Sequence, residues 1–407
     1  MKRLAMFVFV LTLLVSLGTV GISAAEALKI WLPPFGTGDT LDKEFWETAF
    51  VPFEELHNCD VLIEIIPWSN YEDKYLMGFA GGTGPDVGYM SMEMVSSFIQ
   101  MGNITTMDAY ITDEDRSNYL YLEKGIIDGS QYIFPFIVGN PRVLMCNMDI
   151  LQAAGVESVP RTWDEFVAVA LKIMDSDLGV HAFMQPWGDS GNMVTMFYPF
   201  FYQAGGRLVN EGNEIVVDTP EMLKTVQFLY DLRHKYGIVD EVATSLKAGD
   251  VKNLFIEGKV AMIIEATNFS SQATNAGINW EHSLMTEDRQ ATFIAVDSLV
   301  LCSEAKNKEL AYAAIQYMTS GEVMSAYHSQ VSMFAPIGKD EDYADRAQFE
   351  YIYTDSNIDL VPFPAIEGMY KVDDALLRNL QLMQLGQLFP EQVIEDTESY
   401  VAFELDY

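Results

Sequence analysis

The chain has 407 residues, of which 49% are hydrophobic and 20% are charged. This length and apolar content predict two or three compact domains with ample core, and they exclude a small protein stabilised by disulfides. Asp and Glu outnumber Lys and Arg by 59 to 24, so the formal net charge is −35. Nucleic acids and anionic membranes are therefore poor partners for this chain, and we expect a neutral ligand rather than a polyanion.

Residues 1–25 have the pattern of a secretory signal peptide. Lys2 and Arg3 precede an apolar run, and Ser23-Ala24-Ala25 offers small residues for cleavage. No cysteine lies at the cleavage point, so we do not expect a lipoprotein. No later apolar stretch approaches the ~20 residues that a membrane helix needs. The sequence therefore predicts a protein exported to the periplasm or the extracellular space.

Strands and helices alternate along the rest of the chain. Apolar runs predict strands at residues 28–32, 61–66, 87–90 and 293–301. Amphipathic or capped segments predict helices at 41–57, 162–174, 309–319 and 375–385, with another that begins at Asp218-Thr219-Pro220. Thr162 and Glu165 have the spacing of a capping box. This alternation is typical of an α/β fold with mostly parallel sheets flanked by helices.

Two features indicate where a ligand would bind. The segment AGGTGPDVGYM (residues 80–90) predicts a glycine-bearing turn and a strand, whose carboxyl end would present the next residues to the ligand crevice. A phosphate loop is the alternative, but Pro85 and Asp86 follow the glycines in place of Lys and Ser or Thr. Further on, Gly139, Asn140 and Pro141 interrupt two β-rich stretches, which favours a bend where the chain crosses between lobes.

The cysteines and histidines give no sign of a metal site, and no cofactor is expected. Cys59, Cys146 and Cys302 are widely separated and odd in number, so we expect buried free thiols, although one disulfide is compatible with an oxidising compartment. His57 and Cys59 lack the second pair of ligands that a tetrahedral site needs.

Seven segments, taken together in chain order, resemble the extracellular solute-binding proteins of bacterial ABC importers, in the family that includes maltose- and oligosaccharide-binding proteins. They are AGGTGPDV (80–87), DGSQYIFP (128–135), LMCN (144–147), PRTWDEF (160–166), AGGRLV (204–209), EGKVAM (257–262) and AKNKELA (305–311). The resemblance covers nearly the whole chain after the predicted signal peptide.

The resemblance implies a periplasmic-binding-protein fold with two α/β lobes joined by hinge strands, which close over a ligand in the cleft. The first lobe would comprise residues 28–138 and 293–336, and the second residues 139–292 and 337–407. The implied function is non-enzymatic: a monomer captures a sugar, either a mono- or an oligosaccharide, and delivers it to the permease subunits of an ABC transporter.

Sugar recognition needs planar polar groups for the hydroxyls and aromatic rings for the apolar sugar faces. By position in the family motifs, the polar candidates are Glu93 after the GPDV strand, Asp39 after the first strand, and Asn140 and Arg142 at the lobe crossing. Asn268 stands where relatives often carry the tryptophan of a Gly-x-Trp motif. The missing ring argues against long glucans and favours a smaller or different glycan.

The aromatic candidates lie on predicted loops and near the C-terminus. Trp187 is flanked by Pro186 and Gly188, Trp68 and Tyr71 follow the second strand, and Tyr370 lies in a stretch where relatives place a stacking ring. We expect one of Trp68 and Tyr71 to pack as core.

Alternative functions remain open at this point. Gly188-Asp189-Ser190-Gly191 also matches the nucleophile motif of trypsin-like proteases, so an exported serine hydrolase is one alternative. Its histidine base and orienting acid lie in no matching context, and that fold is all-β. A binding protein for a non-sugar solute, or one that signals to a sensor partner, is also compatible with the sequence.

Overall fold

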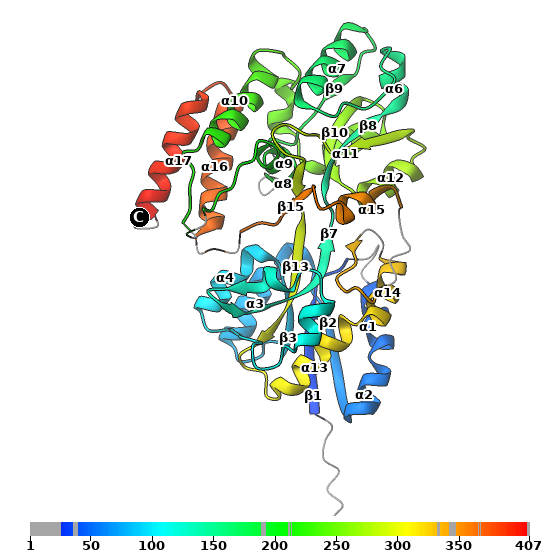
Figure 1. The fold of residues 1–407 in the computed structure, drawn as a ribbon, viewed down its shortest axis with the longest axis vertical. Coiled ribbons are helices and arrows are strands. Elements are labelled where there is room, and N and C mark those ends of the chain that lie inside the picture. The colour runs from blue at the N-terminus through cyan, green and yellow to red at the C-terminus, as the bar shows by residue number, and fades with distance from the viewer. Residues whose placement is uncertain are drawn as a thin grey trace, which may run out of the picture.

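The computed structural model describes residues 26–35, 40–188, 193–210, 212, 214–331, 334–341, 347–364, 366 and 368–404. The chain forms two lobes, which lie one above the other in Figure 1. Strands β7 (Ile133–Gly139) and β13 (Ala295–Cys302) run between them. The predicted signal peptide lies outside the described residues. No helix in the described part of the chain is long and apolar enough to cross a membrane.

The first lobe is built on a sheet with the strand order β14-β7-β13-β3-β1-β2, and β4 also pairs with β13. Besides β7 and β13, its strands are β1 (Glu26–Leu32), β2 (Cys59–Ile65), β3 (Val87–Met90), β4 (Ile104–Thr105) and β14 (Phe334–Ala335). The helices of this lobe are α1 (Leu41–Ala49), α2 (Val51–His57), α3 (Tyr71–Ala80), α4 (Met92–Gln100), α5 (Asp113–Asn118), α13 (Lys308–Met318) and α14 (Gly321–Gln330). Figure 1 shows α3 and α4 on one side of the sheet and α1, α2 and α14 on the other.

The second lobe contains a sheet with the order β11-β8-β10-β9. Its strands are β8 (Arg142–Asn147), β9 (His181–Phe183), β10 (Val260–Ala266) and β11 (Trp280–Ser283). Its helices are α6 (Met148–Ala153), α7 (Trp163–Asp175), α8 (Met193–Met196), α9 (Tyr198–Gln203), α10 (Pro220–His234), α11 (Ala248–Ile256), α12 (Phe269–Asn275), α15 (Ala347–Thr354), α16 (Met369–Gln384) and α17 (Pro390–Glu404).

The predicted two-lobed α/β architecture is confirmed, but the sheets are mixed rather than mostly parallel. Parallel pairs join β1 to β2 and β3, and β10 to β9. The strands that run between the lobes pair antiparallel with their neighbours: β13 with β3 and β7, and β7 with β14. In the second lobe β8 pairs antiparallel with both β10 and β11.

Two predicted elements are each divided in the structure. The helix predicted at residues 41–57 breaks at Phe50 into α1 and α2, because Pro52 lies in the first turn of α2 and has no N–H to continue a helix. The strand predicted at 293–301 is divided between β12 (Ala291–Phe293) and β13. The Thr162 hydroxyl caps α7 by accepting the backbone N–H of Glu165 at 3.2 Å, but the predicted capping box is incomplete, because the Glu165 carboxylate accepts the N–H of Arg161 and not that of Thr162.

Each lobe has its own apolar core. One cluster of buried side chains spans Leu28 to Val138 and Ile294 to Ile337, and the other spans Val143 to Phe293 and Phe349 to Val401. Phe293 therefore packs in the core of the second lobe and Ile337 in the core of the first, whereas the predicted boundaries place each of them in the opposite lobe. Glu341 also belongs with the first lobe, because it is buried against His328 and accepts the Ile337 N–H at 2.9 Å. We propose that the last crossing follows Glu341.

The first crossing between the lobes uses backbone angles that few residues adopt. Gly139, the last residue of β7, has φ 155°, and Asn140, which follows it before β8, has φ 51°. Glycine and asparagine tolerate positive φ better than other residues do. Beside this crossing, β12 pairs with β15 (Asp359–Val361), and Leu360 packs against both cores. The two lobes are thus joined by a narrow group of strands.

Asp42 connects separate segments of the first lobe. It is 1% exposed, and its carboxylate accepts the backbone N–H of Phe35 at 3.0 Å and the hydroxyl of Tyr327 on α14. Burial and the neighbouring Asp42 charge raise the pKa of Tyr327 well above its usual range, so its hydroxyl is a donor at neutral pH. Asp42 thereby fixes the loop after β1 against α14.

We predict that Asp42→Asn lowers the free energy of unfolding by about 2 kcal/mol, because two buried hydrogen bonds lose their charged acceptor. Urea denaturation of the purified protein measures this change. The control is Glu55→Gln on α2, where the side chain is exposed and the substitution is expected to have little effect. Equal stability of the two variants would contradict the role of Asp42.

We also predict an acid-sensitive contribution from His282 on β11. Its ring lies 4.6 Å from that of Phe349 and 5.9 Å from that of Tyr351, and burial lowers the pKa of His282 to about 4. The native state therefore binds a proton less readily than the unfolded state, whose histidine titrates near 6.5. The stabilisation is complete above pH 6.5 and is lost as the pH falls from 6.5 towards 4.

The measurement is the difference in unfolding free energy between the wild type and His282→Gln, followed from pH 7.5 to pH 4.5. As the pH falls, the wild type is expected to lose stability relative to His282→Gln. A pH-independent difference for His282→Gln would show that the buried ring does not titrate in this way.

Candidate functional site

Two neighbouring cavities open between the lobes. The aromatic cavity, of about 370 Å³, lies between α3 and the start of α4 in the first lobe and α8, α9 and α16 in the second. Its lining residues are Trp68, Tyr71, Glu72, Ser91, Met94, Met193, Val194, Tyr198, Phe363 and Asp373. Side chains from both lobes thus face one space, as a ligand held by lobe closure requires.

Trp68 forms a fixed ring at the wall of the aromatic cavity. Its indole N–H donates to the carbonyl of Pro34 at 2.9 Å, and the rings of Phe35 and Tyr89 meet it edge to face at 5.6 Å. The side chain nevertheless remains 51% exposed. An anchored tryptophan with half its surface open gives a flat apolar platform whose orientation is set before a ligand arrives.

Tyr71 packs against the Trp68 ring, with 5.8 Å between the ring centroids. It is buried, and its hydroxyl contacts the Tyr75 hydroxyl at 3.2 Å and donates to the carbonyl of Tyr89 at 3.1 Å. Burial raises the pKa of Tyr71 well above its usual range, so the phenol remains neutral. Tyr71 therefore packs mainly as core beneath Trp68, although its edge reaches the cavity.

The second lobe places a carboxylate on the opposite wall. The hydroxyl of the buried Tyr198 donates to Oδ1 of Asp373, which lies in the second turn of α16. The Tyr198 ring stacks on Tyr202 at 5.5 Å and meets Phe363 edge to face at 6.0 Å. A rigid aromatic stack therefore holds Asp373 in place, where it can accept hydrogen bonds from a ligand.

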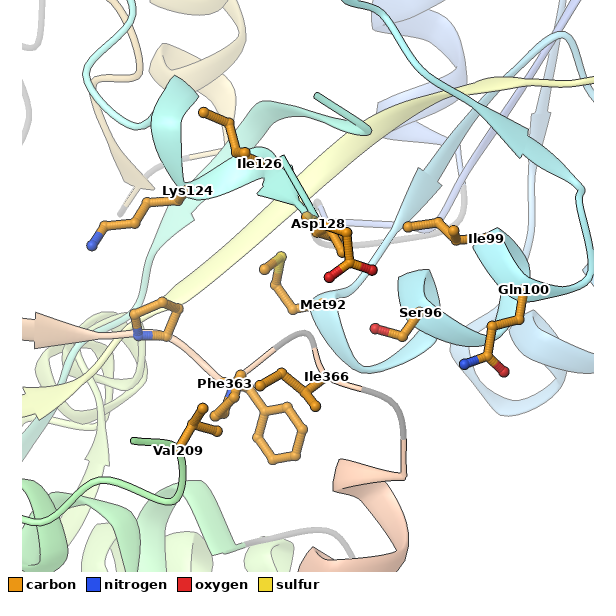
Figure 2. A pocket seen from close by; sticks show the side chains of 13 residues that line it. Met92, Ser96, Ile99, Gln100, Lys124, Ile126, Asp128, Val209, Phe363 and Ile366 are labelled. Atoms are coloured by element: carbon orange, nitrogen blue, oxygen red, sulfur yellow. The ribbon is translucent and has the colours of Figure 1, made fainter. Parts of the chain in front are cut away.

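The aliphatic cavity, of about 500 Å³, adjoins the aromatic cavity, and Phe363 lines both. Its first-lobe wall comes from α4, Lys124, β5 (Ile126–Ile127) and Asp128, which lies on the turn that joins β5 to β6 (Ser130–Gln131). Figure 2 shows this wall facing Val209, Phe363 and Ile366 of the second lobe. The complete lining is Met92, Ser96, Ile99, Gln100, Lys124, Ile126, Ile127, Asp128, Val209, Pro362, Phe363, Pro364 and Ile366.

Four of the nine predicted binding residues lie at or beside these cavities, and one lies outside the described residues. Trp68 and Tyr71 line the aromatic cavity. Glu93 lies in the first turn of α4, between the lining residues Met92 and Met94. Tyr370 lies in the first turn of α16, three residues before the lining residue Asp373. Asp39 lies outside the described part of the chain. The ligand contacts assigned to these residues stay predictions.

Three of the polar candidates lie near the crossing between the lobes. The side-chain oxygen of Asn140 is buried and has no hydrogen-bond partner among the described residues. Arg142 donates to the backbone carbonyl of Asn140, and its guanidinium lies 5.1 Å from the ring centroid of Phe293. Asn268 is exposed at the start of α12. None of them is among the described residues that line the two cavities.

Trp187 lies on a loop after β9, as the sequence predicts, but its ring is packed inside the second lobe. It is 1% exposed, and its indole N–H donates to the side-chain oxygen of Gln185 at 3.1 Å. Its carbonyl accepts Gln381 of α16 at 2.8 Å. In this conformation the ring supports the lobe core, so a stacking role for Trp187 stays a prediction that requires the loop to rearrange.

Sequence reasoning missed Tyr198, Phe363 and Asp373. Tyr198 lies in an aromatic run, MFYPFFY, that is typical of a buried helix, and its ring is in fact buried. Phe363 lies within the stretch PFPAIEGMY that contains Tyr370, and Asp373 follows that stretch. A carboxylate three residues after Tyr370 lies on the same face of a helix as that residue, and this spacing was the available signal.

A family model for bacterial extracellular solute-binding proteins matches residues 35–324, which is more than half of the chain. The chain belongs to this family.

The relatives of this solute-binding protein share its length but little of its sequence. A Brucella abortus (strain 2308) protein described only as a binding protein is 26% identical over 350 residues, 82% of each chain. The galactooligosaccharide-binding protein of Bacillus subtilis (strain 168) is 20% identical and covers 85% of this chain and 83% of its own. A solved ABC transporter solute-binding protein of Thermotoga lettingae, bound with α-D-tagatose, is 23% identical with a TM-score of 0.75, covering 93% of this chain and 99% of that one.

Family membership excludes the enzyme among the alternative functions that the sequence left open. Members are binding proteins of ABC transporters and not enzymes, so the protease-like motif at Gly188 is not a catalytic site. Asp189, Ser190 and Gly191 lie outside the described residues. All three cysteines are buried and free, and no cluster of metal-ligating side chains occurs in the described part of the chain.

We predict that most of the tryptophan fluorescence that a quencher can reach comes from Trp68. Trp68→Phe should remove most of the fluorescence that acrylamide quenches, because the ring is half exposed. Trp187→Phe, at a buried ring, should lower total emission and leave the accessible fraction unchanged. Stern–Volmer plots of both variants measure this. Loss of the accessible fraction in Trp187→Phe would contradict the buried placement of that ring.

Proposed function

We propose that this solute-binding protein captures a mono- or oligosaccharide between its lobes and delivers it to the permease subunits of an ABC transporter outside the cytoplasm. The observation that supports this proposal is the fixed, half-exposed ring of Trp68, which faces the same cavity as the Tyr198–Asp373 pair. The apolar face of a sugar ring would stack on Trp68, and its hydroxyls would donate to Asp373.

The relatives are consistent with a sugar ligand. One is named for binding a galactooligosaccharide, and a structure with the same fold holds α-D-tagatose. In this chain the other polar groups near the sugar would be Ser91 of the cavity wall and, as predicted from the sequence, Glu93. Residues 1–25 would direct export, which agrees with an extracellular family of proteins.

A cationic solute is the second candidate, and it rests on a specific feature of the same cavity. Glu72 of the first lobe and Asp373 of the second both line it, and no Lys or Arg is among its described lining residues. Closure of the lobes would bring these like charges into a drier space, where a ligand ammonium group would reduce their repulsion. Titration with neutral glycans and with a diamine distinguishes the two candidates.

We predict that the purified protein without residues 1–25 binds a neutral glycan from a panel of mono- and oligosaccharides and ignores putrescine. Isothermal titration calorimetry measures both. Trp68→Leu should weaken glycan binding by about tenfold or more, because the stacking surface is lost. The control is Trp280→Leu, which changes a half-buried tryptophan on β11 of the second lobe. Tight binding of putrescine with no response to any glycan would replace the sugar proposal with the cationic one.

A further inference from the structure

The aliphatic cavity has poor chemistry for a sugar ring. Nine of its thirteen lining residues are apolar, and Phe363 is the only aromatic one among them. Sugar hydroxyls buried against isoleucine, valine and proline side chains would lose their bonds to water without gaining partners. An alkyl or aryl group placed there would instead be stabilised by leaving water.

Two of the four polar side chains of this cavity lie at its margin. Figure 2 shows Lys124 extending away from the other labelled side chains, and Gln100 is exposed at the end of α4. Ser96 has a buried hydroxyl with no hydrogen-bond partner among the described residues, and Figure 2 shows the Asp128 carboxylate directed toward Met92 and Ser96. The cavity therefore combines mostly apolar walls with one carboxylate, to which a ligand hydroxyl could donate.

The two cavities adjoin at Phe363. This residue is 5% exposed, its ring packs edge to face on Tyr198, and it lines both spaces. On the first-lobe side, Met92 lines the aliphatic cavity and Met94, on the same helix, lines the aromatic one. A ligand that reaches past Phe363 would place its sugar in the aromatic cavity and its substituent in the aliphatic cavity, where the Met92 side chain can adapt to the shape of the substituent.

We propose that the natural ligand is a glycoside whose apolar alkyl or aryl substituent occupies the aliphatic cavity while its sugar occupies the aromatic one. The proposal rests on the proposed sugar-binding function and adds to it the chemical class of the ligand. The alternative is that the two apolar walls meet each other when the lobes close, in which case a substituent would obstruct closure.

The test compares methyl and n-hexyl forms of β-D-glucoside, β-D-galactoside and β-maltoside in calorimetric titrations below micellar concentrations. For the sugar that binds, the hexyl form is expected to bind about tenfold tighter or more, since each buried methylene contributes about a fourfold gain. Ile126→Asn, at a partly exposed position of the first-lobe wall, should remove this gain and leave the affinity for the methyl glycoside within about twofold.

Val209→Asn changes the second-lobe wall of the aliphatic cavity and should likewise remove the gain from the hexyl group. It replaces Ile126→Asn if that variant folds poorly. The control is Leu56→Asn, at a side chain of α2 that is 79% exposed, and it should keep the full gain. Equal affinities of the methyl and hexyl forms, or weaker binding of the hexyl form, would overturn the inference while leaving the sugar proposal intact. Absence of binding by every methyl and hexyl glycoside, together with binding of putrescine, would overturn both.

Discussion

The separation of the apolar interior into two cores is the constraint on which the rest of the structure depends. Buried side chains of each lobe pack among themselves, and the described contact between the cores is confined to a few residues such as Leu360 beside the crossings. Each lobe is therefore stabilised without the other, and the space between them need not be filled for the protein to fold. The cavities between the lobes follow from this arrangement.

Because each lobe has its own core, the walls of the site are set by contacts within one lobe at a time. Trp68 is held by Pro34, Phe35 and Tyr89 of the first lobe, whereas Asp373 is held by Tyr198 of the second. Neither wall needs the ligand in order to take up its position. Binding energy is then available for bringing two preformed walls together, which is how a ligand shifts a two-state opening and closing equilibrium.

The architecture was accessible from the sequence because the signals that define it are local. The bend at Gly139 and Asn140 was visible as a pair of residues that tolerate positive φ, and the cap at Thr162 as a four-residue pattern. Strand direction was not visible, because the pairing of β13 with β7 and β3 joins segments about 160 to 210 residues apart, and no local pattern specifies which way they run. Pro52 was a local signal whose effect on the helix was underestimated.

The site was harder to predict because burial is a property of the whole fold. Trp187 has the flanking residues of an exposed loop, yet the packing of α16 and the second-lobe core encloses its ring. Trp68 was identified from its place after a strand, but its anchoring by Pro34 depends on a loop 34 residues earlier. Tyr198 and Asp373 are 175 residues apart, so their pairing appears only when α9 and α16 are placed together.

The central claim is that two lobes with separate cores close on a ligand held between them, and a distance across the cleft tests it most directly. Spin labels at Met77→Cys on α3 and Leu385→Cys at the end of α16 would occupy exposed positions, while the native cysteines are buried. Electron–electron double resonance should show a shorter label-to-label distance once a glycan that binds by calorimetry is added. An unchanged distance distribution at saturation with that glycan would contradict the claim.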